Sequence, residues 1–209
     1  MVIMKKFDEL ADEQSIKKTV EGLRKRNVTP IVVNTGKEAH DKVVEIIPEG
    51  VSVMNGSSRT LEQIGFIEHL KSGDHGWDNK HETIVTEEDP KKQSALRKQA
   101  LLADYYLGSV HALTEDGEYI VASNSGSQLP HIAFSSSNIV LVVGTQKIVT
   151  DLNEAFKRLE EYVVPLEEEN MQQKYGVGTQ VSKVLIVKNE HPMTGRKITM
   201  ILIKEKLGF

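Results

Sequence analysis

Two apolar segments, each followed by a short polar segment, dominate the hydropathy pattern of this chain. Residues 119–122 (Tyr-Ile-Val-Ala) predict a half-apolar strand, and the polar turn Ser-Asn-Ser-Gly-Ser follows at residues 123–127. Residues 139–143 (Ile-Val-Leu-Val-Val) have no polar interruption, which is typical of a strand buried on both faces of a parallel sheet. Small and polar residues follow as far as Lys147. We expect the two polar turns to lie side by side at one edge of a sheet and to form the floor of a pocket.

The N-terminal part of the chain alternates between helical and strand patterns. Apolar residues recur at helical intervals between Phe7 and Leu23, which predicts a helical segment within residues 1–29. Residues 31–33 and 51–54 predict two short buried strands with an amphipathic helix between them. A second helix begins near Leu61, so strand and helix alternate twice within about 35 residues. This order is typical of a βαβ unit and implies a parallel sheet with a right-handed crossover.

The remaining segments complete an α/β pattern. Residues 65–90 are the least regular part, and we expect helical pieces and loops there. A helical stretch runs from Pro90 to near Asp104, and a later helix is expected to be interrupted before Pro165. Further strands are predicted at residues 109–114, 182–187 and 197–203. No repeat or linker is evident, so we expect residues 1–209 to form a single α/β domain. Its mainly parallel, Rossmann-like sheet would be flanked by helices and preceded by the N-terminal helical segment.

Composition narrows the classes of partner. The 209 residues carry 26 basic and 30 acidic side chains, well mixed, with a formal net charge of −4, which argues against a nucleic-acid partner. The chain has no cysteine, which excludes disulfides, thiolate nucleophiles and iron–sulfur ligation by this chain and fits a reducing compartment. No apolar run approaches the roughly 20 residues that cross a bilayer. We therefore expect a cytoplasmic protein without a membrane partner.

Three turns that follow predicted strands share a content of glycine, hydroxyl and amide residues. They comprise Asn55, Gly56, Ser57 and Ser58; Asn124, Ser125, Gly126 and Ser127; and Gly144, Thr145, Gln146 and Lys147. Ligands of open α/β sheets bind outside the carboxyl ends of the strands, where such backbone and hydroxyl donors suit a phosphate or carboxylate. Each turn alone is equally explained as a tight turn or helix cap, and none matches a phosphate-loop or dinucleotide motif. The three together favour an anion-binding site, in which Lys147 would supply a positive charge.

Catalytic candidates are fewer. Asp104 ends an apolar helical stretch and is the best candidate for a general base beside Lys147, although such a residue also caps helix ends. His69, His75 and His81 are six residues apart, which is not the spacing of a helical metal-binding pair, so we predict no metal site. His131 lies close enough to the second turn in sequence to reach the pocket, or it is an ordinary loop histidine. No motif identifies a cofactor.

Six segments of the chain resemble the lactate-utilization (LUD-domain) family, in its short, single-domain branch. They are residues 53–65 (VMNGSSRTLEQIG), 103–110 (ADYYLGSV), 116–118 (DGE), 125–127 (SGS), 142–149 (VVGTQKIV) and 201–208 (ILIKEKLG). The resemblance implies the fold shared by ribose-5-phosphate isomerase, glucosamine-6-phosphate deaminase and the CoA transferases, with a pocket at the turns described above. It also implies a link to the oxidation of lactate to pyruvate, in which the partner proteins carry iron–sulfur clusters.

Two departures from the family pattern limit what the resemblance carries over. Many relatives have glutamate in an E-T-G-T motif where this chain has Asn124, which cannot act as a general base. The short branch often has a cysteine cluster after the Pro-Leu pair that corresponds to residues 165–166, and this chain has none. A metal or cluster role is therefore not transferred.

Three functions follow as expectations. The first is binding or conversion of an anionic small metabolite, linked to lactate or another organic acid. The second is a non-catalytic accessory subunit that contacts redox partner proteins through the N-terminal helix and residues 65–90. The third is a sugar-phosphate isomerase, which requires a carboxylate in the pocket. The sequence is also compatible with a homo-oligomer.

Overall fold

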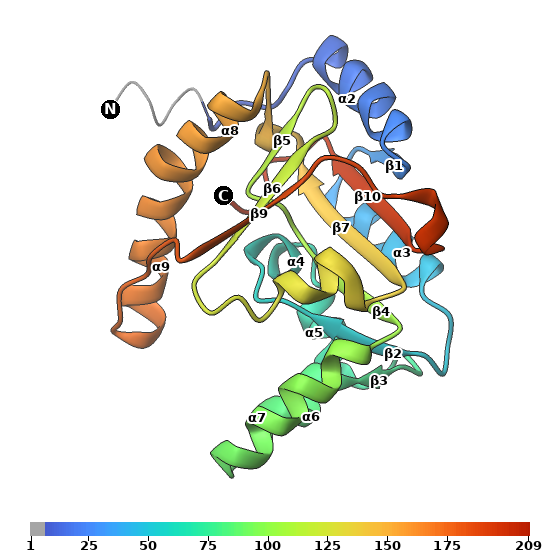
Figure 1. The fold of residues 1–209 in the computed structure, drawn as a ribbon, viewed down its shortest axis with the longest axis vertical. Helices are drawn as coiled ribbons and strands as arrows, with labels where there is room; N and C mark the ends of the chain where they lie inside the picture. The colour runs from blue at the N-terminus through green and yellow to red at the C-terminus, as the bar shows by residue number, and fades with distance from the viewer. Residues whose placement is uncertain (1–6) are drawn as a thin grey trace.

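A six-stranded parallel sheet forms the centre of the computed structural model, which describes residues 7–209 (Figure 1). Every neighbouring pair of strands is parallel. In spatial order the strands are β1 (Val28–Val33), β10 (Lys197–Ile203), β7 (Asn138–Gly144), β4 (Tyr105–Gly108), β2 (Ser52–Asn55) and β3 (Asp78–Asn79). The predicted α/β class is confirmed. The part of the predicted N-terminal segment at residues 1–6 lies outside the described residues.

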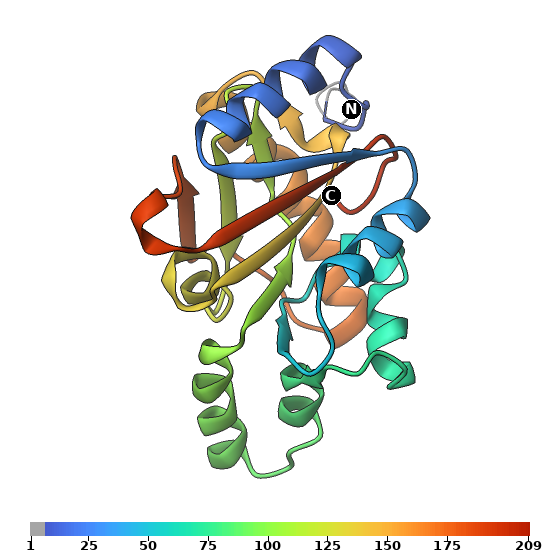
Figure 2. The same cartoon turned by 90° about the vertical axis from the view of Figure 1, so that its right-hand side faces the viewer.

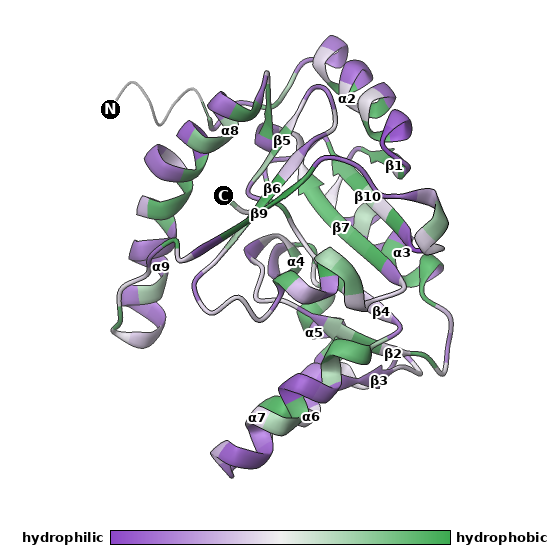
Figure 3. Ribbon diagram, viewed as in Figure 1, coloured by the Kyte–Doolittle hydropathy of each residue, from purple (hydrophilic) through white to green (hydrophobic). Residues whose placement is uncertain are grey.

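Strand β7 shows why the central strands carry continuous apolar runs. Val140 and Val142 pack into the core on one face of the sheet, and Ile139, Leu141 and Val143 pack into a second core on the other face. Figure 3 shows β7 and the adjacent β10 as hydrophobic over most of their length. Because both faces are covered, every position of such a strand favours an apolar side chain.

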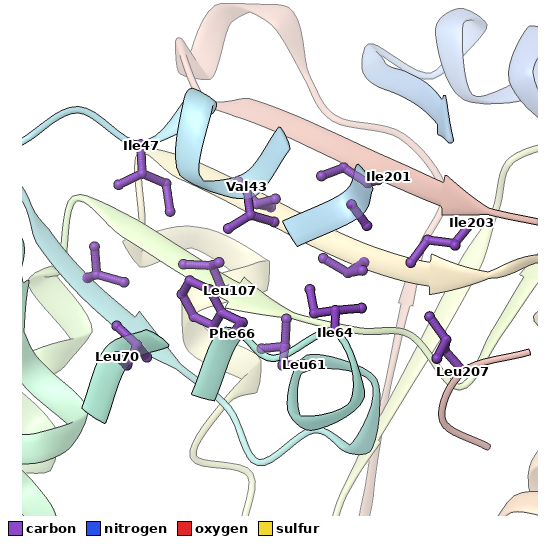
Figure 4. Close-up of a cluster of buried hydrophobic side chains, with 14 of the residues drawn as sticks. Val43, Ile47, Leu61, Ile64, Phe66, Leu70, Leu107, Ile201, Ile203 and Leu207 are labelled. Atoms are coloured by element: carbon purple, nitrogen blue, oxygen red, sulfur yellow. The ribbon is translucent and has the colours of Figure 1, made fainter. Parts of the chain in front are cut away.

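Three helices cover the first face of the sheet. They are α3 (Gly36–Ile46), α4 (Arg59–Gln63) and α5 (Phe66–Ser72). Their buried side chains, among them Val43, Leu61 and Phe66, meet Leu107 and Ile201 of the sheet (Figure 4). The helix–sheet contact fixes where β2 ends, and therefore where the following turn lies.

A second sheet covers the opposite face of the central sheet. The sequence pattern does not predict this second sheet. Its strands are β8 (Ile148–Val149), β5 (Ala112–Thr114), β6 (Tyr119–Ser123) and β9 (Lys183–Val187). The tight turn at Gly117 makes β5 and β6 an antiparallel hairpin, which forms its own sheet with β8 and β9. The expectation that the two polar turns border one sheet is therefore wrong: they follow strands of different sheets.

The outermost layer is a long helical segment packed on the second sheet. It consists of α8 (Leu152–Arg158), a π-type turn (Leu159–Val163) and α9 (Val164–Tyr175). The predicted interruption before Pro165 is a π-type turn: the regular α-helix stops at Arg158 and resumes at Val164. Pro165 has no N–H to donate to the preceding turn, and the break in the helical hydrogen bonding lies there.

Two boundary predictions near the sheet also change. Strand β1 begins at Val28 and contains Pro30, which is tolerated because β1 is an edge strand with one hydrogen-bonded neighbour. The helix from Pro90, α7 (Pro90–Gln99), ends before Asp104, and a short 3-10 turn (Ala100–Leu102) leads toward strand β4. The sequence pattern missed β4 because the apolar residues before Asp104 extend the helical pattern up to it.

The two remaining parts of the fold lie at its ends. Helix α2 (Glu13–Lys25) begins at Asp12, whose carboxylate accepts the Ser15 N–H at 2.7 Å, and it packs Leu23 into the core beside β1. Helices α6 (Lys80–Val85) and α7 project away from the body of the molecule, and α7 buries no residue (Figure 2). Within residues 7–209 no helix combines the length and apolar character that a membrane span requires.

Candidate ligand-binding site

A cavity of about 570 Å³ opens at the carboxyl ends of the parallel strands. The loops after β2 and β4 and the turn after β7 form one wall, through residues 56–60, 109–111 and Lys147. The turn after β6 and the inner face of α9 form the other walls. The cavity therefore lies where a parallel sheet leaves its strand-end loops free to bind a ligand.

Most of the residues predicted to bind a ligand line this cavity. Those that do are Gly56, Ser57, Ser58, Asn124, Ser125, Ser127 and Lys147. Those that do not are Asn55, Gly126, Gly144 and Thr145. Asn55 and Gly144 are the last residues of their strands and are buried, Thr145 is buried directly behind β7, and Gly126 faces the Lys183 side chain.

Asp104 is corrected by the structure, because it lies at the opposite edge of the sheet. It immediately precedes β4, whereas the cavity is beyond the other end of that strand. Its carboxylate accepts hydrogen bonds from the backbone N–H and the hydroxyl of Ser52, at 2.9 and 2.6 Å. These bonds lower the pKa of Asp104 below its usual value. Asp104 joins β2 to β4, and it does not reach the cavity.

Lys147 occupies the floor of the cavity and is only 2% exposed. Its Nζ donates hydrogen bonds to the hydroxyls of Thr60 and Ser109, each at 3.1 Å. No carboxylate among residues 7–209 lies within ion-pair distance of it. Burial, followed by the nearby charge of Arg158, lowers the pKa of Lys147 well below its usual value.

Gly208 keeps the space beside this amine open. It has a φ of 65°, and a Cβ at this position would lie 3.0 Å from Lys147 Nζ and 2.3 Å from Thr60 Oγ1. A side chain there would collide with the hydroxyl and would cover the amine. Glycine also adopts the required left-handed conformation without strain.

Arg158 lies behind the cavity wall and is completely buried. Its Nη1 donates to the carbonyl of His111, and its guanidinium stacks over the Tyr162 ring at 5.1 Å from the centroid. Its Nε and Nη2 have no hydrogen-bond partner among the described residues. The Asp8 carboxylate acts on Arg158 through charge alone, and burial lowers the pKa of Arg158 to about 10. Of the two buried basic groups, Lys147 therefore lines the cavity and Arg158 lies behind its wall, and neither has a hydrogen-bonded acid among the described residues.

His111 adds a neutral polar group to the same wall. Its Nδ1 accepts the backbone N–H of Ala122 at 3.1 Å, so the proton of the neutral imidazole lies on Nε2. Burial first, and then the charges of Lys147 and Arg158, lowers the pKa of His111 to about 3. His111 therefore stays neutral at physiological pH and offers an N–H donor.

Carboxylates occur only at the α9 side of the cavity lining. Glu167 is half-buried there, and its pKa is raised chiefly by desolvation, while Asn170 donates to it at 3.0 Å. Glu62 is occupied by ion pairs with Arg59 and Lys174, at 3.0 and 3.1 Å. Arg59 and Lys174 are thus neutralised by Glu62, whereas Lys147 lines the cavity without an ion-pair partner among the described residues.

The other candidate histidines do not form a metal centre. His69 and His75 lie near each other beside Trp77, with ring centroids of the two histidines 6.0 Å apart, whereas His81 is in α6. No group of three or more potential metal ligands occurs in the described part of the chain. His131 stacks on Tyr106 and hydrogen-bonds Ser136 at 2.9 Å, and it does not line the cavity.

Comparison with known proteins identifies the family. The sequence profile of the LUD domain matches residues 16–203, which is most of the chain. The chain belongs to the LUD-domain family. The fold of this LUD domain is similar to the crystal structure of a DUF162 family protein from Deinococcus radiodurans, with a TM-score of 0.56 and 9% sequence identity. The likeness covers 93% of this chain and 99% of that one, and it supports the fold alone. No curated protein matches the chain at a significant level.

Several groups of this LUD domain were missed by sequence reasoning. Thr60 lies two residues after the first predicted turn, close enough in sequence to be considered with it. Ser109 was assigned to a predicted strand at residues 109–114, whereas that strand, β5, begins only at Ala112. His111 and Arg158 come together only because the second sheet packs against α8, which no local pattern indicates. Glu167 enters the lining because α9 continues past Pro165.

Proposed function

We propose that this LUD domain binds a small anionic metabolite in the cavity and serves in the utilization of lactate or another organic acid. The observation that carries the proposal is the pair of buried basic groups, Lys147 and Arg158, with no hydrogen-bonded carboxylate. The link to lactate rests on the family to which the chain belongs.

When the cavity holds only water, the basic groups of Lys147 and Arg158 are buried without a counter-charge from the described residues bonded to them. Transfer of an ion from water to a protein interior costs several kcal/mol unless a counter-charge or hydrogen bonds offset the loss of hydration. Arg158 leaves two nitrogens unsatisfied, and Lys147 has only two hydroxyl acceptors. A bound anion would supply the missing negative charge at the floor, so the site stabilises a ligand of that sign.

The rest of the lining suits a small, hydrogen-bonding ligand. Hydroxyls of Ser57, Ser58, Ser125 and Ser127 face the cavity from two different loops. The volume of about 570 Å³ is within the range of small-molecule pockets. Hydroxyls on opposite walls allow one ligand to be held from both sides, which would bring the β2 and β6 turns into a common binding role.

A thermal-shift panel of phosphate, lactate, CoA and sugar phosphates tests the proposal. At least one anion should raise the melting temperature of the protein, because a ligand that binds only the folded state stabilises it. The shift should disappear in Lys147→Met and persist in Lys197→Met, which removes an exposed lysine at the other end of the sheet. No shift across the panel, or an equal shift in Lys147→Met, would contradict the proposal.

A second candidate function is that of an accessory subunit which contacts redox partner proteins. The observation that favours it is the projecting pair α6 and α7: α7 buries no residue, and Val85 and Leu102 are 58% and 81% exposed. Gel filtration of the purified chain with a candidate redox partner tests it. Loss of a stable complex in the Val85→Ser, Leu102→Ser double variant would support the role, and an unchanged complex would exclude this surface.

A further inference from the structure

Lys147 has as many hydrogen-bond acceptors around Nζ as a neutral amine has hydrogens. A neutral primary amine has two hydrogens and one lone pair, whereas an ammonium has three hydrogens to satisfy. Lys147 Nζ has two partners, the hydroxyls of Thr60 and Ser109 at 3.1 Å. Those hydroxyls can direct their own hydrogens to the carbonyls of Leu207 and Val110, each at 3.5 Å. The lone pair of the amine is then left without a partner.

The surroundings of the amine favour the same form. Arg158 and His111 lie nearby, and no described carboxylate is in ion-pair contact with Nζ. Burial beside the Arg158 charge lowers the pKa of Lys147, which favours the uncharged amine. Since Gly208 leaves the adjoining volume open and Lys147 lines the cavity, a ligand in the cavity can reach the nitrogen.

We propose that Lys147 is a nucleophile that forms an imine with a small anion carrying an aldehyde or ketone carbon. This inference rests on the proposed function, because the same cavity must first bind the anion. It narrows the ligand class from anions in general to anionic carbonyl compounds. Buried amines next to another cationic group are activated in this way in enzymes that form Schiff bases.

The reaction balances without a further reagent. The lone pair of Nζ attacks the carbonyl carbon, a C–N bond forms, and the carbonyl electron pair moves to oxygen. That oxygen takes up one proton while Nζ releases one, which gives a neutral carbinolamine. The C–O bond then breaks, the C=N bond forms, and the hydroxyl leaves as water with a second proton, which balances the second proton that Nζ releases. The products are one imine and one water for each amine and carbonyl consumed. On this wall of the cavity, the groups that can serve as the proton donor are His111 Nε2–H and the Ser109 hydroxyl.

Reductive trapping tests the proposal. The full chain is incubated with glyoxylate and sodium cyanoborohydride near pH 7, and adducts are located by intact mass and peptide mapping. We expect one reduced adduct per chain, at Lys147. Lys174 provides an internal control, because it lines the same cavity but is held in an ion pair with Glu62. Absence of an adduct at Lys147, or equal labelling of exposed lysines, would overturn the proposal.

Matched variants keep the test independent of folding. Lys147→Met should lose the adduct and Lys197→Met should keep it, with melting curves confirming that both fold. Ser109→Ala retains the amine but removes one acceptor, and we expect labelling to slow by roughly tenfold, the equivalent of one hydrogen bond. Unchanged labelling in Ser109→Ala would show that the two hydroxyls do not orient the amine, and would overturn that part of the proposal.

The two proposals fail in distinguishable ways. If phosphate or lactate stabilises the protein but glyoxylate gives no adduct, the imine is excluded and the anion site stands. If no anion binds and no adduct forms, both are excluded. The pH profile gives a further readout: labelling at Lys147 should extend to lower pH than labelling of exposed lysines, because burial lowers the pKa of its amine. A profile equal to that of free lysine would contradict the proposal.

Discussion

Two buried arginines lie at opposite ends of the sheets, and their surroundings differ sharply. Arg196, just before β10, is ion-paired with Glu190 at 3.2 Å and donates to the carbonyls of His131, Ile132, Ala133 and Ser136. Arg158, behind the cavity, donates to one carbonyl and leaves two nitrogens without partners among the described residues. One guanidinium is fully satisfied by the fold, and the other is not.

The same contrast holds for other polar groups at the amino edge of the parallel sheet, where its strands begin, and at the carboxyl edge, where they end. At the amino edge, Asp104 is held by two bonds from Ser52, and its backbone carbonyl accepts from Asn138 at 3.0 Å. At the carboxyl edge, Lys147 has no acid beside it. The polar groups at the amino edge are therefore satisfied by the fold, whereas Lys147 at the carboxyl edge has no acid partner among the described residues, which supports the proposed ligand site.

The largest expected effect is on stability at the amino edge. Arg196→Met should destabilise the protein by about 3–5 kcal/mol, because it leaves Glu190 buried without its partner. Urea denaturation followed by circular dichroism measures the change. The matched variant Arg158→Met, in which no hydrogen-bonded acid is left behind, should lose much less stability. Equal losses of stability in the two variants would contradict the proposed difference between the amino and carboxyl edges.

The next effect is on ligand affinity at the carboxyl edge. Arg158→Met removes a buried charge close enough to influence Lys147, and we expect anion affinity to fall by roughly tenfold, or about 1.4 kcal/mol. Isothermal titration with the best anion of the thermal-shift panel measures it. Arg196→Lys at the other edge, at a temperature where it remains folded, should leave the affinity unchanged.

Anion affinity should also depend on pH with a definite sign. Burial lowers the pKa of Lys147 in the empty site, and a bound anion raises it. At any pH between these two pKa values, binding of the anion is therefore accompanied by uptake of a proton. Affinity for a non-carbonyl anion such as phosphate, corrected for the ligand's own ionisation, should therefore fall as pH rises through that window. Below the pKa of Lys147 in the empty site, the affinity should no longer change with pH. The dependence should vanish in Lys147→Met; a rise of affinity with pH would contradict the assignment.

The smallest effect is expected at Asp104. Asp104→Asn weakens the bonds from Ser52 at a largely exposed position, and we expect a loss of about 1 kcal/mol of stability. Ligand affinity should not change, since the residue lies at the edge away from the cavity. Because the pKa of Asp104 is lowered in the folded state, its contribution to the free energy of unfolding is present at neutral pH. This contribution is lost as the pH falls toward the folded-state pKa of the Asp104 carboxyl group. A changed affinity in Asp104→Asn would restore it as a candidate site residue.

Sequence reasoning recovered the features that depend on local pattern. Continuous apolar runs located β7 and β10, and the polar turns after β2 and β6 placed Ser57 and Ser125 at the cavity. Lys147 stood out because it closely follows a strand buried on both faces.

The features that were missed depend on packing between distant segments. The apolar residues before Asp104 continue the helical pattern up to β4, so Asp104 was placed at a helix end and on the wrong side of the sheet. The second sheet is joined by hydrogen bonds between β6 and β9, which are some 60 residues apart in the chain. Arg158 contributes to the site only through that sheet, and its isolated position in a helix gives no indication of burial.

The most direct test of the central claim is a crystal soaked in iodide or selenate and measured at a wavelength where the anion scatters anomalously. We predict a peak in the cavity beside Lys147 Nζ, with Ser109 and the turn at Ser57 and Ser58 around it. Peaks confined to exposed lysines, with none in the cavity, would contradict the claim that the carboxyl edge is built to receive an anion.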